Sequence, residues 1–199
     1  MTSHYQKAYF LLSAATIKQL PPDQGKEVAI VGRSNAGKSS VLNTLTHNKQ
    51  LARVSKTPGR TQLINLFALD DERRMIDLPG YGFAKVPEAI KQKWQKLVDN
   101  YITTRACLQG LILVMDIRHP FRPLDIQLLE FCNYHNLSVH ILLNKADKLS
   151  KAAANRTLQN HLSALTVYHN SVTLQLFSAL KGMGIDSLHQ RLNEWYGWT

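Results

Sequence analysis

One loop motif constrains this chain more than any other feature. Residues Gly32-Arg-Ser-Asn-Ala-Gly-Lys-Ser39 match GxxxxGK[ST], directly after the apolar run 28–31 and directly before the helical pattern 40–45. In this setting the glycines let the backbone wrap around phosphates, and its N–H groups and the helix N-terminus attract the anion. Lys38 then reaches the outer phosphates, and the Ser39 hydroxyl is a ligand for Mg²⁺. The motif predicts a nucleotide-binding fold.

Short apolar runs alternate with longer amphipathic runs along the rest of the chain. We expect strands over 27–32, 63–69, 74–78, 111–117, 139–144 and 172–177, and helices over 39–48, 88–104, 124–135, 151–165 and 186–195. This alternation is typical of a mainly parallel sheet with helices on both faces. The link 70–72 is too short for a crossover, so the strands beside it form a hairpin. We predict an α/β P-loop NTPase domain with a six-stranded, mostly parallel sheet and one antiparallel edge strand.

The length of 199 residues and the lack of a Gly/Ser-rich or Pro-rich linker indicate one domain. We expect residues 1–26 to be a leader that packs on the domain and residues 27–199 to be the nucleotide-binding core. The run 7–17 resembles a short signal peptide, but a structured leader closed by Pro21-Pro22 is favoured. The apolar runs fall far short of the ~20 residues of a membrane span, so none is predicted.

The chain is strongly basic, with 24 Lys and Arg against 14 Asp and Glu and a net charge of +10. Residues 1–65 hold nine basic and two acidic residues, so the excess lies near the front. This favours polyanionic partners, although solubilising surface charge explains it equally well. Cys107 and Cys132 lie in apolar stretches without CxxC spacing, so no disulfide framework or zinc site is indicated, and a cytoplasmic, reducing location fits.

Two segments indicate which base is bound. Asn144-Lys-Ala-Asp147 follows a predicted strand, at the edge where the nucleotide must lie, and fits the [NT]KxD pattern of GTPases. An ionised Asp147 accepts two hydrogen bonds from the N1–H and N2–H₂ edge of guanine, and adenine offers no such pair. Phe177-Ser-Ala-Leu-Lys-Gly182 resembles the loop whose backbone N–H groups meet the guanine carbonyl. Each segment is weak alone, but their order behind the P-loop predicts guanine nucleotides.

Two further segments are typical of nucleotide-dependent switches. Asp77-Leu-Pro-Gly80 fits DxxG, in which the Asp holds Mg²⁺ through water and the Gly amide senses the γ-phosphate. The polar and basic segment 55–62 resembles a first switch whose threonine reaches Mg²⁺ in the triphosphate state. Its spacing and the Gly-Arg-Thr resemblance favour Thr61 over Thr57, although residue types alone do not separate the two. A solvated basic loop is the alternative.

The order of these motifs over residues 32–179 resembles that of the translation-factor-related GTPases. The segments 32–40, 55–65, 77–82 and 116–120 together are similar to the EngB family of bacterial GTP-binding proteins. This resemblance implies a single small G domain that binds GTP and GDP with Mg²⁺ and hydrolyses GTP. It also implies a role in large ribosomal subunit assembly and in normal cell division and septation. Asn144 stands where the family often has Thr, and either side chain serves the loop.

The candidate site residues follow from the motifs and the resemblance. Lys38 is the catalytic candidate, and Ser39 and Thr61 are the candidate metal ligands. We expect the nucleotide to be held by Gly32, Arg33, Ser34, Asn35, Ala36, Gly37, Lys38, Ser39, Gly59, Arg60, Thr61, Gln62, Leu63, Asp77, Leu78, Pro79, Gly80, Asn144, Lys145, Ala146, Asp147, Phe177, Ser178 and Ala179.

The water-positioning group is missing from this set. Many signalling GTPases have a glutamine directly after the DxxG glycine, but that position is Tyr81 here. His119 and Gln62 are the other candidates, and both are more simply explained as polar loop residues. We therefore expect slow intrinsic hydrolysis, with a partner completing the site. Asn35 resembles the residue that holds K⁺ beside the phosphates in potassium-assisted GTPases, with ordinary loop polarity as the alternative.

Basic residues cluster around the two predicted switches: Lys49, Arg53, Lys56 and Arg60 by the first, and Lys85, Lys91, Lys93 and Lys96 beyond the second. The expected partner is the large ribosomal subunit or its precursor, through rRNA and ribosomal proteins, with no DNA partner and a monomeric chain. A solvated helix face is an equally simple interpretation of the last three lysines. Trp94 and Trp198 are able to stack on bases, but packing is favoured.

Two other function classes fit parts of the sequence. A P-loop nucleotide kinase would need an arginine-rich lid and an acceptor pocket, and the segments 144–147 and 77–80 argue against it. A G-domain interaction protein at the membrane or division site, without a direct ribosome role, would be favoured if residues 9–17 formed an exposed amphipathic anchor. The preferred prediction is a GTP-dependent switch in large-subunit assembly.

Overall fold

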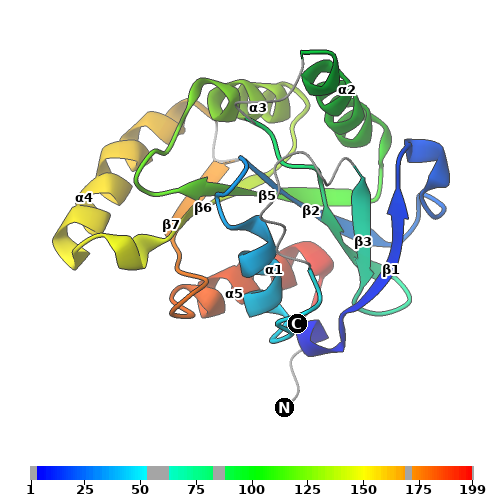
Figure 1. The fold of residues 1–199 in the computed structure, drawn as a ribbon, viewed down its shortest axis with the longest axis horizontal. Helices are drawn as coiled ribbons and strands as arrows, with labels where there is room; N and C mark the ends of the chain where they lie inside the picture. The colour runs from blue at the N-terminus through cyan, green and yellow to red at the C-terminus, as the bar shows by residue number, and fades with distance from the viewer. Residues whose placement is uncertain (1–3, 53–62, 83–87, 169–171, 199) are drawn as a thin grey trace.

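The computed structural model describes residues 4–52, 63–82, 88–168 and 172–198. They form a seven-stranded sheet with helices on both faces, which confirms the predicted α/β fold class (Figure 1). The strand order is β1-β3-β4-β2-β5-β6-β7. The strands are β1 (Tyr9–Ala14), β2 (Lys26–Gly32), β3 (Ile64–Ala68), β4 (Arg73–Asp77), β5 (Leu108–Asp116), β6 (Val139–Asn144) and β7 (Val172–Leu176).

Five α-helices within the described ranges cover the sheet. They are α1 (Lys38–Leu45), α2 (Glu88–Thr104), α3 (Pro123–Tyr134), α4 (Lys151–Leu162) and α5 (Ile185–Tyr196). Helices α1 and α5 cover one face, and α2, α3 and α4 cover the other (Figure 1). The helix expected over 151–165 ends at Leu162 and continues as a 3₁₀ turn over Ser163–Tyr168. In these described ranges, none of the helices combines the length and apolar character needed to cross a membrane.

Two details of the predicted sheet are wrong. The sheet has seven strands rather than six, because Tyr9–Ala14 in the leader pairs antiparallel with β3. Strand β3 runs opposite to its neighbours, as expected, but it lies between β1 and β4 instead of at the edge. Along β1 only Ala14 is buried, so the sequence lacks the alternation that marks a half-buried strand. The pattern of apolar residues in the sequence therefore does not predict this edge strand.

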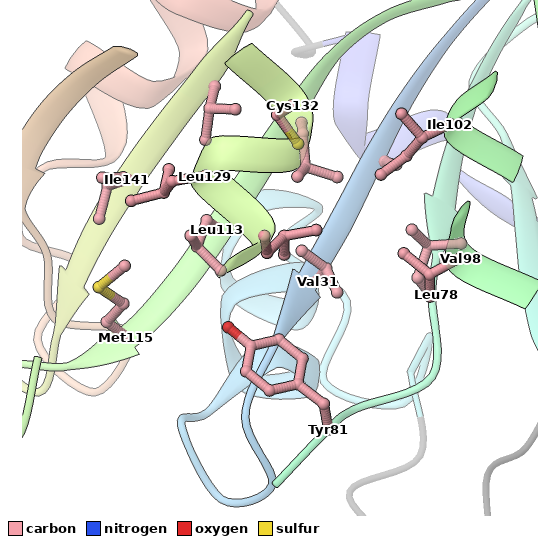
Figure 2. Close-up of a cluster of buried hydrophobic side chains, with 14 of the residues drawn as sticks. Val31, Leu78, Tyr81, Val98, Ile102, Leu113, Met115, Leu129, Cys132 and Ile141 are labelled. Carbon is pink, nitrogen blue, oxygen red and sulfur yellow. The ribbon is translucent and has the colours of Figure 1, made fainter. Parts of the chain in front are cut away.

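Burial on both faces explains the apolar character of the central strands. In β2, Val28 and Ile30 belong to the core cluster shared with α1 and α5, whereas Ala29 and Val31 belong to the opposite cluster. Figure 2 shows part of this second cluster, with Val31 and Leu113 from the sheet facing Leu129 of α3. Successive side chains of a strand point to opposite faces, so a strand covered on both sides is apolar throughout.

The topology brings the expected motifs to one edge. Strands β4, β2, β5, β6 and β7 run parallel to one another, so their carboxyl ends lie at the same edge of the sheet. In open α/β sheets ligands bind in the crevice at this edge. Gly32 ends β2, and a Cβ atom on it would collide with the carbonyl oxygen of Val114 in β5. Glycine is therefore required where the chain leaves β2 to form the loop.

Candidate functional site

The loop from Gly32 to Ser39 connects β2 to the first turn of α1. Asn35 and Gly37 both have positive φ, of 63° and 100°, and α1 begins directly afterwards at Lys38. A Cβ atom on Gly37 would collide with the amide nitrogen of Asn144, so both conformation and space require glycine there. The N–H groups of a helix's first turn have no partners within the helix. The loop therefore offers backbone donors to an anion.

Lys38 and Asp77 form an ion pair between the start of α1 and the end of β4. Their side chains are only 12% and 6% exposed, so the pair is largely shielded from water. The second carboxylate oxygen of Asp77 accepts a 3.3 Å hydrogen bond from Asn65 in β3, whose own oxygen accepts one of 2.6 Å from Ser13 in β1. A polar chain thus runs from the edge strand to the loop lysine. We call the loop Gly32–Ser39 and the segment Asp77–Gly80 together the phosphate side.

Asn144 ties the loop to the last strand. Its amide group donates to the Ala36 carbonyl oxygen at 2.8 Å, and its side-chain oxygen accepts from the Ala179 backbone N–H at 3.2 Å. The side chain is buried. The structure therefore brings together three motifs that are far apart in the sequence, as their order along an α/β fold predicts.

Asp147 faces the segment that follows β7. Its carboxylate accepts a 2.5 Å hydrogen bond from the Ser178 hydroxyl, and this bond is the main cause that lowers the pKa of Asp147. The turn is held by a 3.0 Å bond from the Ala146 N–H to the Phe177 carbonyl oxygen. Asp147 is therefore an ionised acceptor at neutral pH. We call the segments Asn144–Asp147 and Phe177–Ala179 together the base side.

A further ionic cluster was missed from the sequence. The Lys145 ammonium donates to the Asn35 carbonyl oxygen at 2.6 Å and to the carboxylate of Asp116, at the end of β5, at 3.0 Å. Arg118 also binds this carboxylate. Burial raises the pKa of Asp116, but the hydrogen bonds from Arg118 and Lys145 outweigh it and hold the pKa below its ordinary value. Asp116 was recognisable as an acid at the carboxyl end of a buried strand, in register with Asn144.

Some expected residues lie elsewhere or outside the described ranges. Leu63 precedes β3 at the same edge and is 38% exposed. Trp198 packs against the rings of His4, Tyr5 and Tyr196, which agrees with packing rather than base stacking. Other candidates fall outside the description, either wholly or in their side chains: Arg53, Lys56, Thr57, Gly59, Arg60, Thr61, Gln62, Lys85, Lys91 and Trp94.

Similarity to known proteins agrees with this arrangement. Residues 27–145 match the family described as 50S ribosome-binding GTPase. The chain is 52% identical over 192 residues to the probable GTP-binding protein EngB of Coxiella burnetii strain RSA 331, covering 96% of this chain and 94% of the relative. The chain belongs to the EngB family of GTP-binding proteins. The EngB protein of Escherichia coli O139:H28 is 51% identical over 193 residues, covering 97% and 92% of the two chains.

Solved structures share the fold of this EngB family member. A crystal structure of a probable GTP-binding protein engB superimposes with a TM-score of 0.69 at 22% identity, covering 87% of this chain and all of the other. A structure of Era with MgGDPNP and a fragment of 16S ribosomal RNA gives 0.65 at 23% identity, covering 86% and 57%. As a member of this family the protein is a GTPase that binds GTP and GDP, which confirms the predicted guanine nucleotides.

Proposed function

We propose that this GTPase is a nucleotide-controlled switch in the assembly of the large ribosomal subunit, acting as a cytoplasmic monomer. The observation that carries the nucleotide control in this proposal is the direct bonding between the two sides of the site. Asn144 bonds to Ala36 and Lys145 bonds to Asn35, so one nucleotide lying along this edge meets both sides at once. The ribosomal role is supported by the description of the family that residues 27–145 match.

In this proposal the base side selects guanine. The ionised Asp147 accepts hydrogen bonds from the guanine N1–H and N2–H₂, and the backbone N–H groups of the segment 177–179 meet its carbonyl oxygen. Ser178 fixes the Asp147 carboxylate through its hydroxyl, and Asn144 fixes the loop behind it. Charge-assisted hydrogen bonds are the strong ones, so a misaligned or missing pair costs much affinity. Adenine is rejected because it leaves this acceptor unpaired.

The phosphate side holds the charged end of the nucleotide. The backbone donors of residues 32–39 surround the β-phosphate, and Lys38 leaves Asp77 to bind the β- and γ-phosphates. This exchange is feasible because both partners of the ion pair lie at the N-terminus of α1. Lys38 is the first residue of α1, and Asp77 is the last residue of β4. Lys38 stabilises the charge that develops as the γ-phosphoryl group is transferred, which makes it the catalytic residue of the site.

The oxygen atoms at this end suit Mg²⁺. Among the residues that the structure describes, no three His, Cys, Asp or Glu side chains gather closely enough to hold a metal ion. Mg²⁺ does not need such a cluster, because it is bound through a few protein oxygens together with substrate phosphates and water. Ser39 directly follows Lys38 in the chain, and the Lys38 ammonium forms an ion pair with the Asp77 carboxylate. We assign Ser39 and Thr61 as ligands, and Mg²⁺ supplies neutralisation of the phosphate charge when bound.

Potassium is proposed as a second cation, beside the exposed Asn35 in the loop. The backbone carbonyl of this residue accepts from the Lys145 ammonium, and its exposed side chain offers an amide oxygen to an ion. Hydrolysis rates in KCl and in NaCl at equal ionic strength test this assignment. A rate that is higher in KCl for the wild type and equal in both salts for Asn35→Ala supports it, and equal rates in the wild type reject it.

Intrinsic hydrolysis is proposed to be slow. Tyr81 takes the position where many signalling GTPases have a glutamine, but its side chain is 2% exposed. A buried phenol cannot contact a water molecule that attacks the γ-phosphate from the solvent side. A partner therefore completes the site, and nucleotide state rather than turnover is the main output.

Exposed lysines provide the proposed contact with ribosomal RNA. Lys49 follows α1, and Lys93 and Lys96 lie on α2, all with exposed side chains. Each lysine that neutralises an RNA phosphate steepens the dependence of binding on salt, by about 0.7 to 0.9 in log–log slope. Sedimentation with 50S particles and their precursors, in a GTP analogue, in GDP and without nucleotide, across a salt series, tests the proposal. Analogue-dependent, salt-sensitive binding supports it, and absent or nucleotide-independent binding rejects it.

A double variant that removes the charge of two of these lysines tests the RNA contact more directly. Lys93→Gln with Lys96→Gln should lower the salt slope by about 1.5. Lys151→Gln, at the exposed start of α4, is the matched control and should leave the slope unchanged. A slope that is the same in all three proteins would place the RNA contact away from α2.

A role in normal cell division and septation is part of the proposal, on the strength of family resemblance alone. The competing idea, a G-domain protein at the membrane or division site, would be favoured by an exposed amphipathic anchor over residues 9–17. Residues 9–14 instead form strand β1, paired with β3. Liposome sedimentation beside ribosome sedimentation separates the two ideas, because only the competing one expects the protein to pellet with lipid alone.

A further inference from the structure

Tyr81 is placed unusually for the residue after a DxxG glycine. Its ring lies in the core cluster between the sheet and α3, together with Val31 and Leu113, and only 2% of the residue is exposed (Figure 2). The hydroxyl donates a hydrogen bond to the carboxylate of Asp125 in α3. Burial, and then the charge of Asp125, raise the pKa of Tyr81 well above its ordinary value, so the phenol keeps its proton and remains the donor.

The backbone of Tyr81 is bound to the phosphate-binding loop. Its N–H donates to the Gly32 carbonyl oxygen at 3.3 Å, and its carbonyl oxygen accepts from the Ser34 N–H at 2.8 Å. These bonds lie on either side of Arg33, with which Tyr81 forms a parallel bridge. Gly80 is the residue directly before Tyr81, so its carbonyl shares the peptide unit whose N–H bonds to Gly32, and its own N–H lies one peptide unit before this short ladder.

Asp125 is equally fixed. It is 1% exposed, and its second oxygen accepts a 2.8 Å hydrogen bond from the Arg122 N–H, which caps the start of α3. Its neighbours Leu124 and Ile126 are exposed, at 40% and 37%. A shift of the Tyr81 hydroxyl therefore acts on the capped first turn of α3, between two apolar side chains at the surface.

We propose that Tyr81 is a positioning residue that sets the reach of the Gly80 amide towards the γ-phosphate and passes the nucleotide state to α3 through Asp125. This inference rests on the proposed role of Asp77–Gly80 in sensing that phosphate. The side chain that replaces the usual glutamine thus serves nucleotide discrimination and not the attacking water. Coupling between two sites is reciprocal, so a link that tightens binding of the triphosphate must also change the first turn of α3 by the same free energy.

The test compares affinities for GDP and for a non-hydrolysable GTP analogue. Tyr81→Phe keeps the buried ring and removes only the hydroxyl, and Asp125→Asn removes the charge of the acceptor. Each should weaken analogue binding about fivefold, the low end of typical couplings, and leave GDP affinity within about twofold. The double variant should be no weaker than either single variant, because both remove one interaction. Tyr134→Phe, also on α3 but 81% exposed, is the matched control and should change neither affinity.

Hydrogen exchange at the backbone N–H groups of residues 124–127 gives a second readout that a purely structural role would not move. The wild type should show different protection with analogue and with GDP, and Tyr81→Phe should remove that difference. An analogue-to-GDP affinity ratio that stays unchanged, as it does when both nucleotides weaken equally, would overturn the inference. A difference in exchange between the analogue and GDP that persists in Tyr81→Phe would overturn it as well.

Asp77→Asn separates this inference from the proposed function on which it rests. If Asp77→Asn lowers the analogue-to-GDP affinity ratio and Tyr81→Phe does not, only the proposed role of the Tyr81–Asp125 hydrogen bond is rejected. If Asp77→Asn leaves the ratio unchanged, the sensing role of the segment 77–80 fails, and the inference fails with it.

Discussion

The base side and the phosphate side of the site differ in what their polar groups bind. On the base side each side chain bonds to a fixed group nearby: Asn144 to two backbone groups, and Asp147 to the Ser178 hydroxyl. On the phosphate side Lys38 and Asp77 bind each other. The base side is therefore assembled for guanine without rearrangement, whereas the phosphate side must exchange partners when a nucleotide enters. Binding energy that depends on the γ-phosphate is thus concentrated on the side that has to move.

The largest expected effect comes from breaking the phosphate side. Lys38→Met should lower the rate of GTP hydrolysis by about 10² to 10³-fold, because it removes the main positive side chain from the developing phosphate charge. GDP affinity should fall by less, since the base side is untouched. Single-turnover hydrolysis and GDP titration measure the two effects. Lys151→Met, exposed on α4, is the control, and a rate for Lys38→Met within tenfold of wild type would contradict the assignment.

The second effect breaks the base side. Asp147→Asn should weaken GDP and GTP alike, by about 100-fold, because a charged acceptor of two hydrogen bonds is replaced by a neutral group with one acceptor. It should also gain affinity for xanthosine nucleotides, whose ring carries a carbonyl where guanine has its amino group. Competition titration with guanosine, xanthosine and adenosine diphosphates measures this. Asp186→Asn, exposed in the first turn of α5, should retain guanine preference, and a variant at position 147 that still prefers guanine would reject the assignment.

Both sides were visible in the sequence as motifs, but several of their contacts were not. Each motif lies at the end of an apolar strand, and the parallel order of an α/β sheet brings those strand ends together. The contacts of Tyr81 with Asp125 and of Asp116 with Lys145 were not predicted, because they depend on strand register and on where α3 packs. Strand β1 was missed for a related reason. Its partner β3 lies about 50 residues away, and its own side chains are mostly exposed.

A third test concerns the framework that carries the base side. His140 lies in β6 and bonds to Thr173 and Gln175 of β7, and Gln175 also donates to the Gly184 carbonyl oxygen before α5. Burial lowers the pKa of His140 to about 4 from an ordinary 6.5. The folded state therefore disfavours the proton that the unfolded state accepts. The stability associated with neutral His140 is present above pH 6.5 and is lost as the pH falls from 6.5 towards 4.

Between pH 7 and pH 5 this histidine should remove about 2 kcal/mol from the free energy of unfolding. Urea unfolding at the two pH values measures the loss. His140→Gln should show a smaller loss, because it has no group that titrates in this window, whereas His119→Gln, which is exposed, should behave like the wild type. The same pH dependence in all three proteins would show that other groups control acid stability.

The smallest effect sharpens the comparison most, because it acts where the two sides touch. Asp116→Asn keeps an oxygen that accepts from Lys145 but removes the negative charge of the side chain. Lys145 is then positioned less firmly on the Asn35 carbonyl oxygen. The pair is partly exposed, and a loss of about 1 kcal/mol, or about fivefold in affinity, is expected for GDP and for the GTP analogue alike. Arg118→Ala removes the more exposed partner of the same carboxylate and should cost less than twofold.

Equal weakening of both nucleotides by Asp116→Asn contrasts with the analogue-only weakening expected of Tyr81→Phe. The first residue supports the part of the site that every guanine nucleotide uses, and the second supports the part that only a triphosphate engages. If Asp116→Asn instead weakened the analogue alone, the contact between Lys145 and Asn35 would also contribute to binding of the γ-phosphate. The division into an assembled base side and a responsive phosphate side would then have to be redrawn around the loop itself.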